Sequence, residues 1–107
     1  MSLSSDDVEG ESDMEKSVAL VDTFRLDYYQ LYMMQIEKAK SEGVDIQGVF
    51  AWSLMDNFEW GDGLDFRFGI TYVDFNDPTL PRSAKDSAIW WTQLIGNMSS
   101  SESVVVA

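Results

Sequence analysis

The sequence of 107 residues contains no cysteine and no histidine. Without cysteine the chain can form neither disulfide bonds nor thiolate metal sites. Without histidine it has no Ser-His or Cys-His nucleophile pair and lacks the commonest zinc ligand. There is also no glycine-rich phosphate loop and no dinucleotide-binding fingerprint. Acid–base chemistry is therefore limited to carboxylates, lysines and tyrosines, and the sequence predicts no cofactor.

Basic residues are also scarce, because 7 lysines and arginines face 19 acids and give a formal net charge of −12. Such a charge repels both phosphate backbones and anionic lipid surfaces. No apolar run approaches the roughly 20 residues of a membrane helix, and the N-terminus lacks a basic and apolar targeting pattern. We expect neither a nucleic-acid partner nor a membrane partner, and the sequence predicts no compartment.

The acidic clusters at residues 62–65 and 74–77 do not form a calcium loop. Counted from Asp74, the sixth position is Thr79, where an EF-hand needs glycine, and the twelfth is Lys85, where it needs glutamate. The sequence therefore predicts no metal site.

Composition separates a central segment from two polar ends. Residues 1–13 are acidic and have few apolar residues to bury, and residues 98–107 are rich in serine. We expect a flexible acidic lead-in over 1–13, a folded segment over 14–97 and a disordered tail over 98–107.

A long amphipathic helix is predicted over 14–41, with a break near Asp22. The side chain of Asp22 is a suitable N-cap for the second part, and Gly43 is placed to end the helix. Apolar residues recur at helical spacing and include a Met-aromatic stripe, which predicts core packing. The recurring residues are Val18, Val21, Phe24, Leu31 and Met34, and the stripe is Tyr29, Met33 and Ile36.

Two strands and a second helix are predicted after this helix. Residues 49–54 form an apolar run typical of a strand buried on both faces, and the sequence offers no neighbouring strands for it. Residues 66–75 have strand character, and a loop bounded by Pro78 and Pro81 follows. A helix over 84–95 is expected to present an apolar face made of Ile89, Trp90, Leu94 and Ile95.

The stretch 48–60 has the most chemical content, because it places Glu59 between Phe58 and Trp60 and also contains Trp52. An indole can stack on the apolar face of a pyranose, while a carboxylate accepts hydrogen bonds from its hydroxyls. This pattern fits a sugar clamp, and it also fits a structural aromatic cluster. Asp56 is expected to hold the loop through backbone hydrogen bonds.

At this point the sequence resembles glycoside hydrolase family 1, the β-glucosidase-like retaining enzymes. Residues 50–60 (FAWSLMDNFEW) are similar to the signature near the C-terminus of that family. Four further stretches follow the family's order, from about residue 22 to residue 96: DTFRLDYY at 22–29, EGVDIQG at 42–48, RFGITYVD at 67–74 and PRSAKDSA at 81–88.

The resemblance implies an α/β fold, namely the C-terminal portion of a (β/α)8 TIM barrel. The portion would comprise helix 7, strand 8 with its long loop and a short hairpin, and helix 8. By the same resemblance, Trp52 lines the glycone subsite and Glu59 accepts hydrogen bonds from the sugar's O4 and O6 hydroxyls. Trp60 would donate its indole N–H to another hydroxyl, and Phe68 would be a lesser wall residue.

The catalytic motifs of the family are missing from the sequence. Neither Asn-Glu-Pro, which carries the acid/base, nor Thr-Glu-Asn-Gly, which carries the nucleophile, occurs. Glu9 lacks the expected asparagine and a preceding apolar strand, so no catalytic residue is assigned.

Two functions remain open. The chain is either the glycone-binding C-terminal part of a retaining β-glycosidase, inactive alone, or a non-catalytic carbohydrate-binding or protein-interaction fragment of a degenerate barrel. The expected partners are a β-glycoside sugar and the N-terminal part of the barrel.

Overall fold

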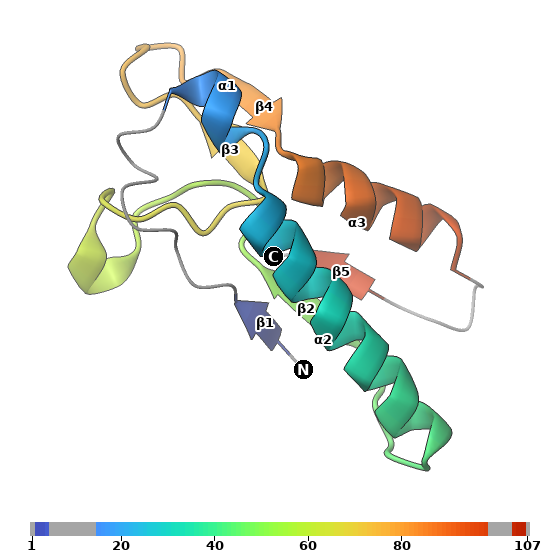
Figure 1. Ribbon diagram of the computed structural model, residues 1–107. Coiled ribbons are helices and arrows are strands. Elements are labelled where there is room, and N and C mark those ends of the chain that lie inside the picture. Colours follow the sequence, from blue (N-terminus) through green and yellow to red (C-terminus); the bar gives the residue numbers. More distant parts are fainter. Residues whose placement is uncertain (1, 5–14, 99–103, 107) are drawn as a thin grey trace.

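A computed structural model describes residues 2–4, 15–98 and 104–106 (Figure 1). The elements in chain order are β1 (Ser2–Ser4), α1 (Lys16–Ala19), α2 (Thr23–Ser41), β2 (Val49–Trp52), the 3₁₀ helix η2 (Trp60–Asp62), β3 (Thr71–Val73), β4 (Arg82–Ala84), α3 (Asp86–Gly96) and β5 (Val104–Val106). None of the helices in these ranges is long and apolar enough to cross a bilayer.

The predicted helix and its break are confirmed. Helix α1 ends at Ala19 and α2 begins at Thr23, directly after Asp22. At the other end Gly43 follows α2 with a φ of 96°, a conformation that costs glycine little.

Asp22 does not cap α2, contrary to the prediction from the sequence. Its side chain makes no capping bond to α2. Instead Oδ1 accepts a hydrogen bond of 2.9 Å from the backbone N–H of Ser87, and Oδ2 lies 3.0 Å from Nη1 of Arg25. Because Ser87 is in the first turn of α3, Asp22 satisfies an N–H at the start of a different helix and joins α2 to α3.

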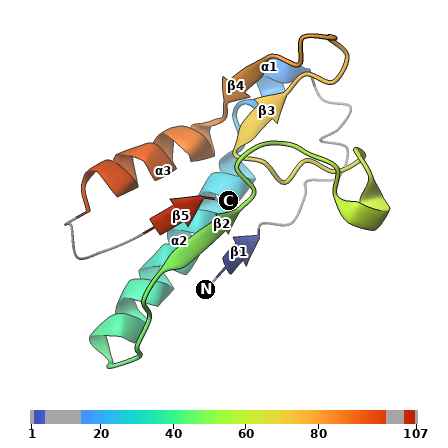
Figure 2. The same cartoon turned by 180° about the vertical axis from the view of Figure 1, so that it is seen from behind.

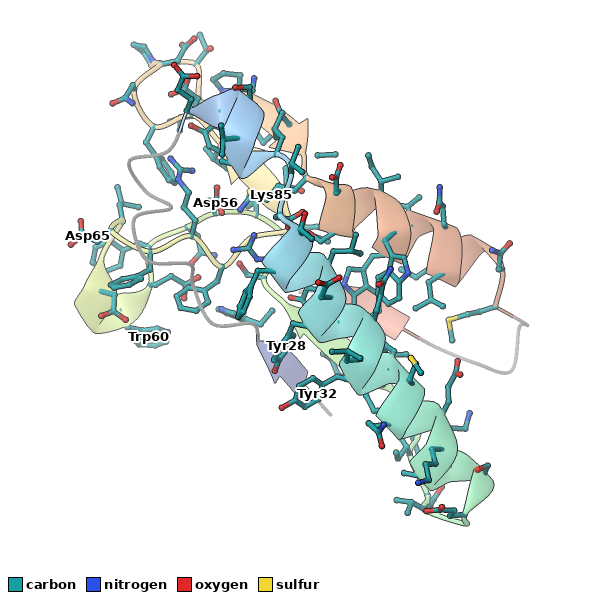
Figure 3. All side chains as sticks on the ribbon, in the orientation of Figure 1. Tyr28, Tyr32, Asp56, Trp60, Asp65 and Lys85 are labelled. Carbon is teal, nitrogen blue, oxygen red and sulfur yellow. The ribbon has the colours of Figure 1, made fainter. Side chains whose placement is uncertain are left out.

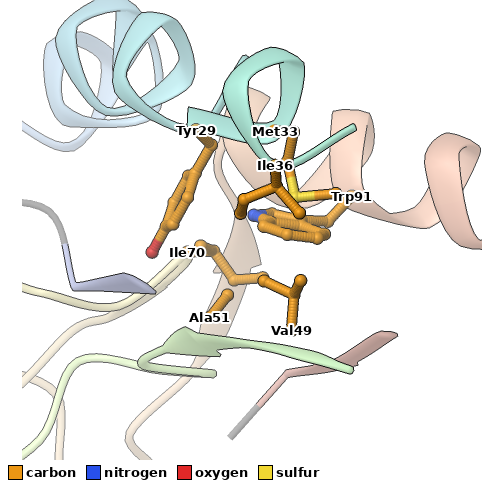
Figure 4. Packing of buried hydrophobic residues seen from close by; sticks show 7 residues of the cluster. All are labelled: Tyr29, Met33, Ile36, Val49, Ala51, Ile70 and Trp91. Atoms are coloured by element: carbon orange, nitrogen blue, oxygen red, sulfur yellow. The ribbon is translucent and has the colours of Figure 1, made fainter. Parts of the chain in front are cut away.

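The core lies between α2, α3 and one face of β2 (Figure 4). Tyr29, Met33 and Ile36 of α2 are buried in it, which confirms the predicted stripe. The remaining members are Val49, Ala51, Ile70 and Trp91.

The buried face of α3 is centred on Trp91, which the sequence prediction did not include. Trp91 is the fully buried residue, with 0% of its surface exposed, whereas Ile89 and Ile95 are exposed. Trp90 and Leu94 pack only at the margin of the core. The five apolar residues at helical spacing in and before α2 are exposed as well: Val18, Val21, Phe24, Leu31 and Met34. Periodicity locates a helix, but it does not show which of two apolar faces a partner covers.

Strand β2 has neighbours within the chain, contrary to the sequence prediction. It pairs in parallel with β1 on one edge and with β5 on the other. Residues 2–4 and 104–106 therefore form strands where a flexible lead-in and a disordered tail are predicted. An open edge of an apolar strand is a template for any extended segment, which gives the two ends a physical reason to pair there. The rest of both predicted ends, apart from Met98, lies outside the described residues.

The predicted short hairpin is present. Strands β3 and β4 pair in antiparallel fashion, with Tyr72 opposite Ser83. The strand predicted over 66–75 is confined to Thr71–Val73, and the helix predicted from residue 84 begins at Asp86. The loop between β2 and β3, with η2 at its tip, extends away from the helices in both views (Figures 1 and 2).

The burial of Trp91 leads to the first testable prediction. Trp91→Ala should lower the free energy of unfolding by about 3–5 kcal/mol, because a large buried ring leaves a cavity. Ile89→Ala, on the exposed side of the same helix, is the matched control and should change it by less than about 0.5 kcal/mol. Urea denaturation measures both, and equal losses would contradict the position of the core.

Candidate functional site

Strand β2 presents its two faces to different surroundings. Val49, Ala51 and Ser53 are buried towards the helices, while Phe50 and Trp52 alternate with them and are exposed. Figure 2 shows β2 from the side opposite α2. The alternation places the ring of Trp52 away from the core, at the point where the strand gives way to the loop.

Hydrogen bonds from α2 and from the loop hold the backbone around Trp52. The hydroxyl of Tyr29 donates a hydrogen bond of 2.9 Å to the carbonyl of Trp52. The next residue, Ser53, exchanges backbone hydrogen bonds with Phe68 (3.1 Å) and Ile70 (2.9 Å). The Trp52–Ser53 peptide bond is cis.

Glu59 is a buried carboxylate, with 7% of its surface exposed. Its Oε2 accepts a hydrogen bond of 3.4 Å from the indole Nε1 of Trp52. Its Oε1 is buried and has no hydrogen-bond partner within residues 15–98. A buried oxygen without a donor costs free energy, so Oε1 is suited to accept a hydrogen bond from a ligand beside Trp52.

The other two predicted site residues are Trp60, which directly follows Glu59, and Phe68. Trp60 has a φ of 47° and is 85% exposed, at the tip of the loop (Figure 3). Phe68 is partly buried, and its carbonyl accepts the hydrogen bond from Ser53. The structure thus joins Trp52 to Glu59, and contact of all four residues with a sugar stays a prediction.

Asp56 anchors the loop from the inside, as predicted. Its carboxylate accepts hydrogen bonds from the backbone N–H groups of Gly69 (3.1 Å) and Val73 (3.2 Å). It also forms ion pairs with Arg67 (2.6 Å) and Lys85 (3.1 Å), and both partners are buried. Asp56 and Lys85 lie together in Figure 3. One carboxylate thereby connects the loop, strand β3 and the start of α3.

Arg67 and Lys85 were missed by reasoning from the sequence, as was the role of Arg25. The guanidinium of Arg67 lies 4.3 Å from the ring centre of Tyr72 and donates to the carbonyl of Val73 at 2.9 Å. Arg25 donates to the carbonyl of Arg67 at 2.6 Å. Three of the chain's seven bases are thus buried. The sequence did contain one signal for their burial: these basic residues stand within apolar stretches of a strongly acidic chain.

Within residues 2–4, 15–98 and 104–106 the acidic residues show no metal-binding arrangement. No group of three acids in the described ranges could hold a metal ion. On the exposed turn after β3, hydrogen bonds from the backbone N–H and the hydroxyl of Thr79 lower the pKa of Asp77 below its usual value.

The chain is similar to known proteins of one family. The sequence pattern of Glycosyl hydrolase family 1 matches residues 5–100. The chain is 46% identical over 79 residues to Beta-glucosidase 24 of Oryza sativa subsp. japonica, covering 74% of this chain and 16% of that protein. It is 46% identical over 85 residues to Raucaffricine-O-beta-D-glucosidase of Rauvolfia serpentina, covering 79% and 15%.

Solved structures agree with the sequence match. The crystal structure of the beta-glucosidase from Trichoderma harzianum superposes with a TM-score of 0.83 and 38% identity, over 97% of this chain and 21% of that one. The GH1 beta-glucosidase from Humicola insolens in complex with glucose superposes with a TM-score of 0.79 and 38% identity, over 86% and 19%. The chain therefore spans about a fifth of these structures, and its fold is consistent with part of a TIM barrel.

Close packing at Gly69 leads to the second prediction. A Cβ atom at this position would lie 2.1 Å from the backbone nitrogen of Asp56 and 2.3 Å from the carbonyl carbon of Met55. Gly69→Ala should therefore push the loop off β3 and lower the free energy of unfolding by at least about 1–3 kcal/mol.

Gly61→Ala is the matched control, since a Cβ there meets no atom within 4 Å of the described structure. Urea denaturation of the two variants measures the free energy of unfolding of each. If Gly69→Ala is as stable as Gly61→Ala, the loop does not pack as described.

Proposed function

This chain belongs to glycosyl hydrolase family 1, and we propose that it carries the glycone-binding residues of a retaining β-glycosidase. Family membership brings the reaction class, hydrolysis of O-glycosyl bonds, because the relatives named above are β-glucosidases. The chain covers only about a sixth of the curated relatives, so activity and substrate belong to this proposal.

The buried Oε1 of Glu59 is the single observation that carries the proposal. An ionised carboxylate oxygen gains most from a donor when water is excluded from it. In the described residues Oε1 has no such donor, while the other oxygen receives the indole N–H of Trp52. The O4 and O6 hydroxyls of a pyranose, which are carried by C4 and C6, are donors of the right kind.

The ring of Trp52 supplies the second half of sugar recognition. It is 38% exposed and lies on the face of β2 away from the core. A half-exposed indole offers a flat apolar surface to the C–H face of a pyranose, and its hydrogen bond to Glu59 fixes its orientation. We assign Trp60 as a further donor to a sugar hydroxyl and Phe68 as a wall residue.

We infer a place for the chain in the barrel from the order of its elements. We assign α2 as helix 7, β2 as strand 8, the segment from Ser53 to β4 as the long loop with its hairpin, and α3 as helix 8. Active-site residues of such barrels lie at the carboxyl ends of the strands, where Trp52 ends β2. Residues 14–97 would form the barrel segment, flanked by the lead-in 1–13 and the tail 98–107.

Catalysis would need groups from the remainder of the barrel. The two carboxylates of a retaining enzyme stand about 5–5.5 Å apart, one as acid/base and one as nucleophile. We assign neither role to an acid of this chain, so we expect the isolated 107 residues to be inactive. The partners we propose are a β-glycoside and the N-terminal part of the barrel, without nucleic acid or membrane.

A chimaera tests the function directly. In it, residues 15–98 replace the matching segment of the Trichoderma harzianum beta-glucosidase. Glu59→Gln in this chimaera should lower kcat/KM for an aryl β-glucoside by about 10–100-fold, since a charged hydrogen bond is worth about 1.5–3 kcal/mol. An analogue without the O4 and O6 hydroxyls should lose much less.

Glu37→Gln is the matched control, because Glu37 is exposed on α2. It should leave both rates unchanged. Equal losses for the two substrates would remove Glu59 from the glycone site. A chimaera that binds the glucoside without hydrolysing it would favour the alternative function, a non-catalytic carbohydrate-binding fragment.

A further inference from the structure

The loop after β2 loses its backbone hydrogen bonds at Asn57. The preceding residues 53–56 are held against residues 68–71 by backbone hydrogen bonds of 2.9–3.1 Å. Asn57 and Phe58 make no backbone hydrogen bond within the part of the chain that the structure describes, and Phe58 is 70% exposed. Glu59 follows directly, so its place depends on what side chains do at this junction.

The side chain of Asn57 bridges the junction back to the fixed segment. Its Nδ2 donates to the hydroxyl of Ser53 at 3.2 Å and to the carbonyl of Met55 at 2.9 Å. The hydroxyl of Ser53 donates to the same carbonyl at 3.0 Å, which closes a triangle of three polar groups. Both hydrogens of the amide are thus in use. Ser53 is buried, and exclusion of water strengthens such bonds.

The bridge lies between the two halves of the proposed sugar site. Trp52 directly precedes Ser53, and Glu59 comes two residues after Asn57. The indole Nε1 of Trp52 lies 3.4 Å from Oε2 of Glu59, at the long end of the range for a hydrogen bond. A small displacement of the chain after Asn57 would therefore break this bond and move the buried Oε1 of Glu59.

We propose that Asn57 is a positioning residue, which sets the place of the Glu59 carboxylate beside the indole of Trp52. It thereby sets how strongly the site prefers sugars that carry the O4 and O6 hydroxyls. The inference rests on the proposed function, because it needs Glu59 to accept hydrogen bonds from these hydroxyls. Both amide hydrogens of Asn57 are donated to the chain, so its effect on the sugar passes through Glu59.

The indole proton of Trp52 reports the position of Glu59 without any sugar. In NMR spectra of the 107-residue chain, Glu59→Ala removes the acceptor and should shift the Trp52 Nε1–H resonance upfield. Asn57→Leu has a similar shape but no amide, and it should shift the resonance in the same direction. Asn76→Leu is the matched control, because Asn76 is exposed on the turn after β3, and it should leave the resonance in place. An unmoved resonance in Asn57→Leu would overturn the inference.

The chimaera with the Trichoderma harzianum enzyme tests the effect on sugar preference. Asn57→Leu should lower kcat/KM for the aryl β-glucoside about tenfold, since a misplacement of about 1 Å can cost up to a hundredfold. The analogue without the O4 and O6 hydroxyls should lose less than about twofold, because it does not use Glu59. Asn76→Leu should change neither rate. Equal losses for the two substrates would show that Asn57 only supports the fold, against the proposal.

Ser53→Ala is a milder variant that decides the question if Asn57→Leu does not fold. It removes one acceptor of the amide and leaves the carbonyl of Met55. The ratio of the two kcat/KM values should fall in the same direction by about two- to threefold, and an unchanged ratio would contradict the proposal.

Glu59→Gln in the same chimaera separates this inference from the proposed function. If Glu59→Gln lowers both rates equally, the proposed function fails. If Glu59→Gln discriminates between the substrates and Asn57→Leu does not, the function stands and only the positioning role of Asn57 fails.

Discussion

The carboxylate of Asp56 is the interaction on which the rest of the loop depends. It is 2% exposed and is surrounded by Arg67, Lys85 and the N–H groups of Gly69 and Val73. Removing a charge from water costs several kcal/mol, and four donors offset this cost only when all are in place. Loss of one partner leaves buried charge behind, which typically costs about 3–5 kcal/mol. The cluster therefore has one low-energy arrangement, and it fixes the loop against β3 and α3.

The proposed sugar site inherits its geometry from this cluster. Trp52 and Glu59 lie on either side of Asp56 in the sequence, and their side chains meet again through a hydrogen bond of 3.4 Å. Tyr29 holds the carbonyl of Trp52 from the side of the core. A carboxylate oxygen can remain buried without a donor only where its surroundings are held rigidly by other contacts. The Asp56 cluster thus holds in place the loop that carries Glu59, the carboxylate that we propose for sugar recognition.

Sequence reasoning succeeded where the signal was local. The break before Asp22, the stop at Gly43 and the stripe of Tyr29, Met33 and Ile36 follow from propensity and periodicity. It failed where partners are distant along the chain, because nothing local pairs Asp56 with Lys85 or Asp22 with Ser87. Trp91 was missed because both sides of α3 are apolar, and the choice between them depends on α2. The strands at the two ends were missed because three residues carry too little pattern. Chemistry and family resemblance predict Trp52 and Glu59 as parts of one sugar site; the structure joins them by a hydrogen bond, and their contact with a sugar stays a prediction.

The measurement that tests the central role of Asp56 most directly is amide hydrogen exchange of the wild-type chain, followed by NMR. The N–H groups of Gly69 and Val73 donate to the buried carboxylate, whereas Gly61 and Leu64 lie on the exposed part of the loop. If Asp56 holds the loop, Gly69 and Val73 should exchange at least about a hundredfold more slowly than Gly61 and Leu64 after correction for intrinsic rates. Exchange of all four amides at similar rates would contradict this account.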